Sequence, residues 1–240
     1  GNAFILKVAS PVPSASHFVA RLYQEAGLPD GLFNVIAGDR NLVGDILTHP
    51  GIDAISFVGS SPVAHIVQDT GVSHGKRVQA LGGANNHAIV MPDADIEFAA
   101  QHISAGAFGA AGQRCMALPV IVAVGGIAEK LVPAIKARAE KIVVGPGTDP
   151  ACEMGPVITR SSQQRITKWI DEAEANGASV VLDGRGYKPE GEEYADGFWL
   201  GPTILDNVDR KLDIYCEEVF GPVLVVVHAD TYEEAIEIVN

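Results

Sequence analysis

One cysteine in this sequence has neighbours that could make it a nucleophile. Cys115 follows a stretch of glycines and alanines between residues 106 and 112, and glycines let a backbone approach a ligand closely. Gln113 and Arg114 stand directly before it, and a guanidinium beside a thiol favours the nucleophilic thiolate. The alternative is a small apolar cysteine in a buried helix, because free cysteine is among the most buried residue types. The stretch alone leaves both interpretations open.

A second candidate site is the segment Gly59-Ser-Ser-Pro62, which lies between an apolar run and a helical pattern. We expect Ser60 to cap the helix and Pro62 to stand in its first turn, so that backbone amide groups face an anion. We therefore predict that Gly59 and Ser60 belong to a binding site for the pyrophosphate of a dinucleotide. An ordinary capped helix is the alternative. The usual Rossmann fingerprint, G-x-G-x-x-G, is absent from every strand-to-helix turn.

Two further segments contain residues that could contact a cofactor. In Glu217-Glu-Val-Phe-Gly-Pro222, the Glu218 carboxylate could bind sugar hydroxyls while Phe220 packs on a ring. The alternative is a polar loop that enters a strand. Lys7 ends an apolar run, and a lysine is costly to bury without a partner. A cofactor ribose or phosphate is one such partner, and simple surface exposure is the alternative.

The elements that must position these residues alternate between strand and helix, which predicts an α/β fold with right-handed crossovers and a mostly parallel sheet. A boundary near Gly82-Gly83 divides the chain into two domains, residues 1–81 and 82–240. The predicted strands are 4–8, 32–37, 54–58, 77–81, 87–91, 120–124, 179–182 and 223–228, and the predicted helices are 14–25, 39–47, 62–69, 94–108, 128–141, 161–176 and 232–240. Residues 184–201 are expected to form a surface loop or hairpin.

The amino-acid composition limits the kinds of molecule that this protein is expected to bind. Lys and Arg number 17 against 30 Asp and Glu, and the net charge of −13 argues against nucleic acid or an anionic membrane. Three widely spaced cysteines do not form a disulfide framework and suggest a reducing compartment. We interpret Cys152 and Cys216 as structural. The histidines lack metal-ligand spacing, so no metal site is predicted.

Taken together, the chain resembles the aldehyde dehydrogenase superfamily along essentially its whole length. The order and spacing of several segments carry the resemblance: 1–7, 25–31, Phe57-Val-Gly-Ser60, Leu81-Gly-Gly83, Gly112-Gln-Arg-Cys115, Met154-Gly-Pro156 and Glu217–Pro222. Within the superfamily, residues 76–79, 86–93 and 110–117 are most similar to the methylmalonate-semialdehyde dehydrogenase branch. The resemblance implies part of a Rossmann-type cofactor domain followed by an α/β catalytic domain, with the chain truncated at both ends.

The resemblance also implies roles for the candidate residues. Cys115 would attack the aldehyde carbonyl, and its own backbone N–H would stabilise the oxyanion. Lys7 would reach the adenosine ribose of NAD, while Gly59 and Ser60 would hold the pyrophosphate. Glu218 would bind the nicotinamide ribose, with Phe220 beside it. Ser10 stands where many NAD-specific members carry a glutamate, which leaves NADP open as the cofactor.

Ala80 is the main departure from the family pattern. The family motif has a glutamate immediately before Leu-Gly-Gly, and that glutamate activates water, whereas this chain offers a methyl group. Without that base, water is a poor nucleophile near neutral pH, and so coenzyme A is the expected acyl acceptor. Arg114 could grip the distal carboxylate of a (methyl)malonate semialdehyde, with a structural salt bridge as its alternative.

Two other functions stay open at this point. One is a hydrolytic semialdehyde dehydrogenase, such as a succinate-semialdehyde type, and the other is a truncated module that only binds. We expect these 240 residues alone to be inactive. The full-length protein is expected to be a homo-oligomer, a homotetramer, in the cytoplasm or, in a eukaryote, the mitochondrial matrix.

Overall fold

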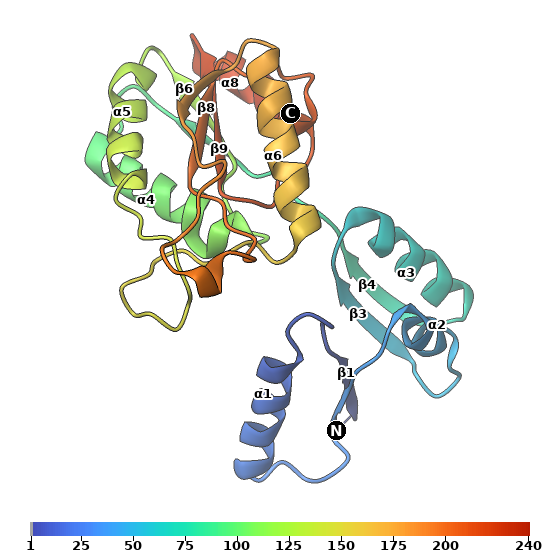
Figure 1. The fold of residues 1–240 in the computed structure, drawn as a ribbon. Coiled ribbons are helices and arrows are strands. Elements are labelled where there is room, and N and C mark those ends of the chain that lie inside the picture. Colours follow the sequence, from blue (N-terminus) through green and yellow to red (C-terminus); the bar gives the residue numbers. More distant parts are fainter. Residues whose placement is uncertain (1) are drawn as a thin grey trace. The chain divides into compact units, whose positions relative to one another are not determined.

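The computed structural model describes residues 2–240, which divide into two compact units, Gly1–Gly83 and Ala84–Asn240 (Figure 1). Gly1, which opens both the first segment of the resemblance and the first predicted domain, lies outside the described residues. The boundary between the two units lies after Gly83, whereas the sequence predicted it after residue 81. The roles that the sequence assigns to the two units stay predictions.

The first unit contains two pairs of parallel strands. Strand β1 pairs with β2 in the register Phe4↔Phe33, and β3 pairs with β4 in the register Ala54↔Arg77. Each strand is followed by a helix or precedes one, as the alternation in the sequence predicts. The elements are β1 (Phe4–Lys7), α1 (Pro13–Glu25), β2 (Phe33–Ile36), α2 (Arg40–Thr48), β3 (Ala54–Val58), α3 (Ser61–Ser73) and β4 (Arg77–Leu81).

The two strand pairs of this unit form separate sheets. A hollow of about 1100 Å³ is lined by residues of β1, α2, β3 and β4. Helix α3 packs closely on β4, because a Cβ on Gly71 would lie 2.6 Å from Cγ2 of Val78. Gly71 thus permits a close helix-to-strand approach.

The second unit is built on a five-stranded sheet in the order β5-β6-β9-β8-β7. All neighbouring strands are parallel except β7 and β8. Helices α4 and α5 lie on one face of this sheet and α6 on the other (Figure 1). The elements are β5 (His87–Val90), α4 (Ile96–Phe108), η1 (Gly109–Gly112), β6 (Val120–Val124), α5 (Ala128–Ala139), α6 (Arg160–Ala175), β7 (Ser179–Leu182), η2 (Glu192–Tyr194), β8 (Thr203–Asp206), α7 (Asp213–Cys216), β9 (Val223–Ala229) and α8 (Tyr232–Val239).

The core of the second unit surrounds the two innermost parallel strands, β6 and β9. Every residue of β6 is buried, and so is every residue of β9 except His228. A parallel strand that is covered on both faces needs apolar residues at consecutive positions, which explains the uninterrupted valine and leucine run of β9. This sheet fixes the edges from which the loops around Cys115 and Glu218 emerge.

The predicted fold class is confirmed, and the differences are local. Strand β8 and the short helix α7 were not predicted. Strand β8 has only four residues, and its burial between β7 and β9 comes from sequence-distant partners, so its own pattern is weak. Helix α3 continues to Ser73, beyond the predicted end at residue 69. No helix within residues 2–240 is long and apolar enough to cross a membrane.

Candidate active site

Cys115 lies on an exposed turn between the end of α4 and the start of β6. The turn is closed by a hydrogen bond of 3.0 Å from the backbone N–H of Ala117 to the carbonyl of Arg114. Its next residue, Met116, is 85% exposed. The interpretation of Cys115 as a buried helical residue is therefore wrong, because the helix ends at Phe108, before the cysteine is reached.

The backbone that leads to Cys115 is strained. Ala110, Ala111 and Gly112 have φ angles of 52°, 55° and 66°, which lie in the left-handed region. This conformation costs an L-residue with a side chain roughly 1–2 kcal/mol. Gly112 also lies so close to the carbonyl of Gly221 that a Cβ on it would overlap that oxygen. The strain and the close approach bring the Cys115 turn against the loop that contains Glu218, a pattern found at functional sites.

The side chain of Gln113 ties this turn to two other loops. Its Nε2 donates to the carbonyl of Phe220 at 3.3 Å, and its Oε1 accepts from the N–H of Ile158 at 2.9 Å. Phe220 itself has a φ of 44°, in the left-handed region. A residue with a side chain rarely adopts this conformation unless its surroundings hold it there. Gln113 and Gly112 supply such surroundings on one side of the Phe220 loop.

Arg114 gathers with two other predicted site residues. A small hollow of the second unit, with a volume of about 10 Å³, is lined by Arg114, Glu218 and Phe220, together with the backbone of Gly112. The guanidinium of Arg114 lies against Gly109, where a Cβ would overlap it. Within residues 2–240 Arg114 makes no ion pair with a carboxylate, so nothing described supports the alternative of a structural salt bridge.

Glu218 has a cationic neighbour that sequence reasoning missed. Arg165, on α6, donates from Nη2 to the carbonyl of Val219 at 2.8 Å and stacks over the ring of Trp169 with 4.5 Å from Cζ to the ring centroid. Burial lowers the pKa of the Arg165 guanidinium, and the negative charge of Glu218 opposes that shift. An arginine on an amphipathic helix carries no sequence signal that separates this role from solvent exposure. Only the packing of α6 against the loop reveals it.

Asn86 is a second residue that sequence reasoning left without a role. Its Nδ2 donates to the carbonyl of Cys115 at 2.9 Å and to the carbonyl of Ala117 at 2.8 Å. The residue is partly buried and immediately precedes β5. Asparagine is common in loops, so its type and position in the sequence do not predict contact with the turn 29 residues further on.

The other four predicted site residues belong to the first unit. Ser60 stands at the N-cap of α3, as predicted, but its hydroxyl makes no capping hydrogen bond. The neighbouring Ser61 accepts a hydrogen bond at 3.0 Å from the N–H of Gly83 instead. Gly59 precedes the cap, and a Cβ on it would lie 2.5 Å from the Phe57 ring. The first amide groups of α3 are thus left without a cap from Ser60.

Lys7 and Ser10 lie at and just beyond the carboxyl end of β1. Lys7 is partly buried, pairs with Ile36 in the strand register and lines the 1100 Å³ hollow of its unit. Ser10 is exposed in the turn that leads to α1. The predicted position of Lys7 at the end of a strand is confirmed. The contacts of Lys7 and Ser10 with a cofactor stay predictions.

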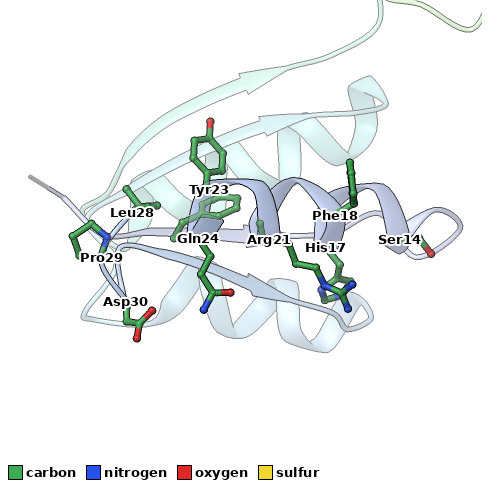
Figure 2. A pocket seen from close by; sticks show the side chains of 12 residues that line it. Ser14, His17, Phe18, Arg21, Tyr23, Gln24, Leu28, Pro29 and Asp30 are labelled. Carbon is green, nitrogen blue, oxygen red and sulfur yellow. The ribbon is translucent and has the colours of Figure 1, made fainter. Parts of the chain in front are cut away.

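A different hollow of the first unit contains none of the predicted site residues. It has a volume of about 820 Å³ and is lined by one side of α1, the following loop and Phe33. Figure 2 shows Arg21, His17 and Gln24 along α1 and Asp30 in the loop after it. These side chains are mostly exposed, and they do not include a nucleophile with an activating neighbour.

The structure also describes the surroundings of the other two cysteines and of the potential metal ligands. Cys216 donates from Sγ to the carbonyl of Arg210 at 3.0 Å, and all three cysteines are free thiols. Burial, together with the nearby Asp149 carboxylate, raises the pKa of the Cys152 thiol, which makes the thiolate less available. Among residues 2–240, no group of three or more His, Cys, Asp or Glu side chains could hold a metal ion.

Comparisons with known proteins agree over the whole chain. A family model described as "Aldehyde dehydrogenase family" matches residues 1–240. The chain is 46% identical to a malonate-semialdehyde dehydrogenase from Pseudomonas aeruginosa, with all of this chain and 48% of that protein covered. It is 47% identical to the mitochondrial, acylating methylmalonate-semialdehyde/malonate-semialdehyde dehydrogenase of Bos taurus, with all of this chain and 44% of that protein covered.

A solved structure is similar as well. A Sinorhizobium meliloti protein complexed with NAD matches with a TM-score of 0.95 and 47% identity, over 99% of this chain and 48% of that one. The chain thus spans about half the length of the curated relatives and of the solved structure that it matches.

Proposed function

The chain belongs to the aldehyde dehydrogenase family, and from this we propose that the protein containing it oxidises a (methyl)malonate semialdehyde to a coenzyme A thioester with NAD. The observation that carries the proposal is the exposed Cys115 on a strained turn held against the loop of Glu218 and Phe220. Relatives named for malonate semialdehyde, one of them acylating, support the substrate class. These 240 residues, about half of such a protein, are proposed to be inactive alone.

The residues present fit NAD as the cofactor. The N-terminal amides of α3, left uncapped by the Ser60 side chain, suit a pyrophosphate that carries negative charge. The Glu218 carboxylate is an acceptor suited to ribose hydroxyls, with Phe220 as an apolar neighbour. Lys7 and Ser10 are proposed to face the adenosine ribose, where Ser10 would tolerate a 2′-phosphate and thus NADP. When bound, the cofactor supplies the acceptor for the hydride.

Cys115 is proposed to perform the covalent chemistry. Its thiolate adds to the aldehyde carbon and forms a carbon–sulfur bond, while the carbonyl oxygen becomes an oxyanion. The backbone N–H of Cys115 donates no hydrogen bond within the described residues, so it is available to that oxyanion. After oxidation the acyl group is a thioester on Cys115. Coenzyme A, with its thiol proton released to solvent, then attacks this carbonyl as a thiolate, the carbon–sulfur bond to Cys115 breaks, and the cysteine leaves as a thiolate.

Ala80 provides the test of the acyl acceptor. It lies on β4, partly buried, in register with Phe57 of β3, and it lacks the carboxylate with which the family activates water. Replacing Ala80 by glutamate in the full-length protein should raise the ratio of free acid to coenzyme A thioester by up to about a hundredfold, because a general base then assists hydrolysis. The ratio is measured at fixed coenzyme A concentration by chromatography of the products.

Ala80→Gln is the matched control, because it has the same size and no base. Equal ratios for the glutamate and glutamine variants, in folded proteins that bind cofactor, would contradict the role of position 80 in choosing the acceptor. A wild-type protein that forms free acid at the same rate with and without coenzyme A would favour the hydrolytic alternative.

Arg114 provides the test of the substrate class. Arg114 is exposed and makes no ion pair in the described residues, so its charge is available to a substrate carboxylate. Replacing Arg114 by leucine should raise the KM for malonate semialdehyde about ten- to a hundredfold. This factor corresponds to the free energy that a charge-assisted hydrogen-bonded pair typically contributes to binding. The KM for propanal, which has no distal carboxylate, should change little. Similar losses for both aldehydes would assign Arg114 a structural role.

The localisation and the assembly of the whole protein are proposed from its family relationship. The cytoplasm, or the mitochondrial matrix in a eukaryote, suits three free thiols and is consistent with the mitochondrial relative. A homotetramer is the proposed assembly. Size-exclusion chromatography with light scattering of the full-length protein tests it directly.

A further inference from the structure

The turn that carries Cys115 is held by one amide side chain from outside it. Both protons of the Asn86 amide are positioned for hydrogen bonds, one to the carbonyl of Cys115 at 2.9 Å and one to the carbonyl of Ala117 at 2.8 Å. The turn closes itself only through the Ala117 N–H to the Arg114 carbonyl. Asn86 therefore makes two of the three hydrogen bonds in which the backbone of residues 114–117 takes part within the described structure.

The sheet explains why Asn86 can reach the turn. Asn86 directly precedes β5, and the Cys115 turn precedes β6 by a few residues. These strands are parallel neighbours with His87 opposite Val120, so their first residues lie at the same edge of the sheet. The distance between Asn86 and the turn is thus set by the strand register and not by a flexible loop.

We propose that Asn86 is a positioning residue for the nucleophile, an inference that rests on the proposed function of Cys115. By accepting from Asn86, the carbonyl of Cys115 fixes the plane of the peptide that follows the cysteine. The N–H on the other side of Cys115 keeps no partner within residues 2–240 and is left to the substrate oxyanion. A displacement of about 1 Å in such a group can cost on the order of a hundredfold in rate.

The neighbouring residue, Asn85, offers a matched control. It has the same side chain, but its Nδ2 donates to the carbonyl of Tyr215 at 2.6 Å and makes no bond to the Cys115 turn. Its Oδ1 is buried and lacks a hydrogen-bond partner in the described structure. Replacing Asn85 thus removes a hydrogen bond that stabilises the same segment, without touching the nucleophile.

The test compares Asn86→Ala, Asn86→Asp and Asn85→Ala in the full-length protein with saturating NAD and coenzyme A. For both Asn86 variants, kcat should fall about ten- to a hundredfold while the KM for NAD stays within about threefold. The rate at which iodoacetamide alkylates Cys115, followed for each cysteine by mass spectrometry, should change in the same variants. The Asn85 variant should keep both rates, and urea unfolding of all variants shows how far a general loss of stability accompanies each change.

Asn86→Gln keeps the donor on a longer side chain and should recover part of the lost kcat. If Asn86→Ala and Asn86→Gln both match Asn85→Ala in kcat and in Cys115 alkylation, the positioning role is overturned and Asn86 is structural. Cys115→Ala separates this failure from that of the proposed function. An active Cys115→Ala protein refutes the nucleophile itself, whereas an inactive one beside unaffected Asn86 variants refutes only the inference about Asn86.

Discussion

Replacing Cys115 by alanine in the full-length protein should abolish aldehyde oxidation and leave cofactor binding nearly unchanged. The reason is that the thiol is the only group proposed to bond to the aldehyde carbon, while its side chain is exposed and supports no core contact. Loss of a covalent nucleophile typically removes several orders of magnitude of rate. The measurements are NADH production at 340 nm and NAD affinity by fluorescence titration.

The two other cysteines serve as controls for this result. Cys152→Ala and Cys216→Ala remove thiols that lie outside the Cys115 turn, and both should retain activity. In wild-type protein, dilute iodoacetamide should label Cys115 first, with NADH production lost in proportion. Equal labelling of all three cysteines would argue against special reactivity at Cys115.

Replacing Gly112 by alanine should separate the two loops of the candidate site. The residue has a φ of 66°, and its added Cβ would overlap the carbonyl of Gly221, a backbone atom that cannot rotate away. The strained φ costs about 1 kcal/mol, and overpacking adds typically 1–3 kcal/mol. We expect a loss of about 2–4 kcal/mol in the free energy of unfolding of this unit, or a displaced Glu218 loop with NAD affinity at least tenfold weaker.

Gly126→Ala isolates the steric part of this effect. Gly126 has a φ of 80°, but a Cβ there meets nothing within 4 Å. The alanine at position 126 therefore adds the same backbone strain without the clash. Urea unfolding and NAD titration of both full-length variants give the difference, and a Gly112 variant no worse than the Gly126 variant would show that the loops do not depend on this close approach.

The sequence by itself determined the class of fold, and it predicted which residues could do chemistry. Apolar runs of strand length alternate with helical patterns, and this local periodicity is enough to predict an α/β fold with parallel strands. The type of a side chain also shows which reactions it could perform, even when no structure is known. The thiol after Gln-Arg was recognisable because nucleophiles belong to few residue types. Glu218 is one of 30 acidic residues, and only the resemblance to the family singled it out.

Only the tertiary structure decided which of these residues meet. The exposure of Cys115 depends on where α4 ends and on three successive left-handed residues, and no periodicity encodes that conformation for the two alanines among them. Arg165 and Asn86 reach the site from segments far along the chain because α6 packs beside the Glu218 loop and β5 pairs with β6. Contacts of this kind are set by strand register and helix packing, which sum over many distant residues, and so no local stretch of sequence contains them.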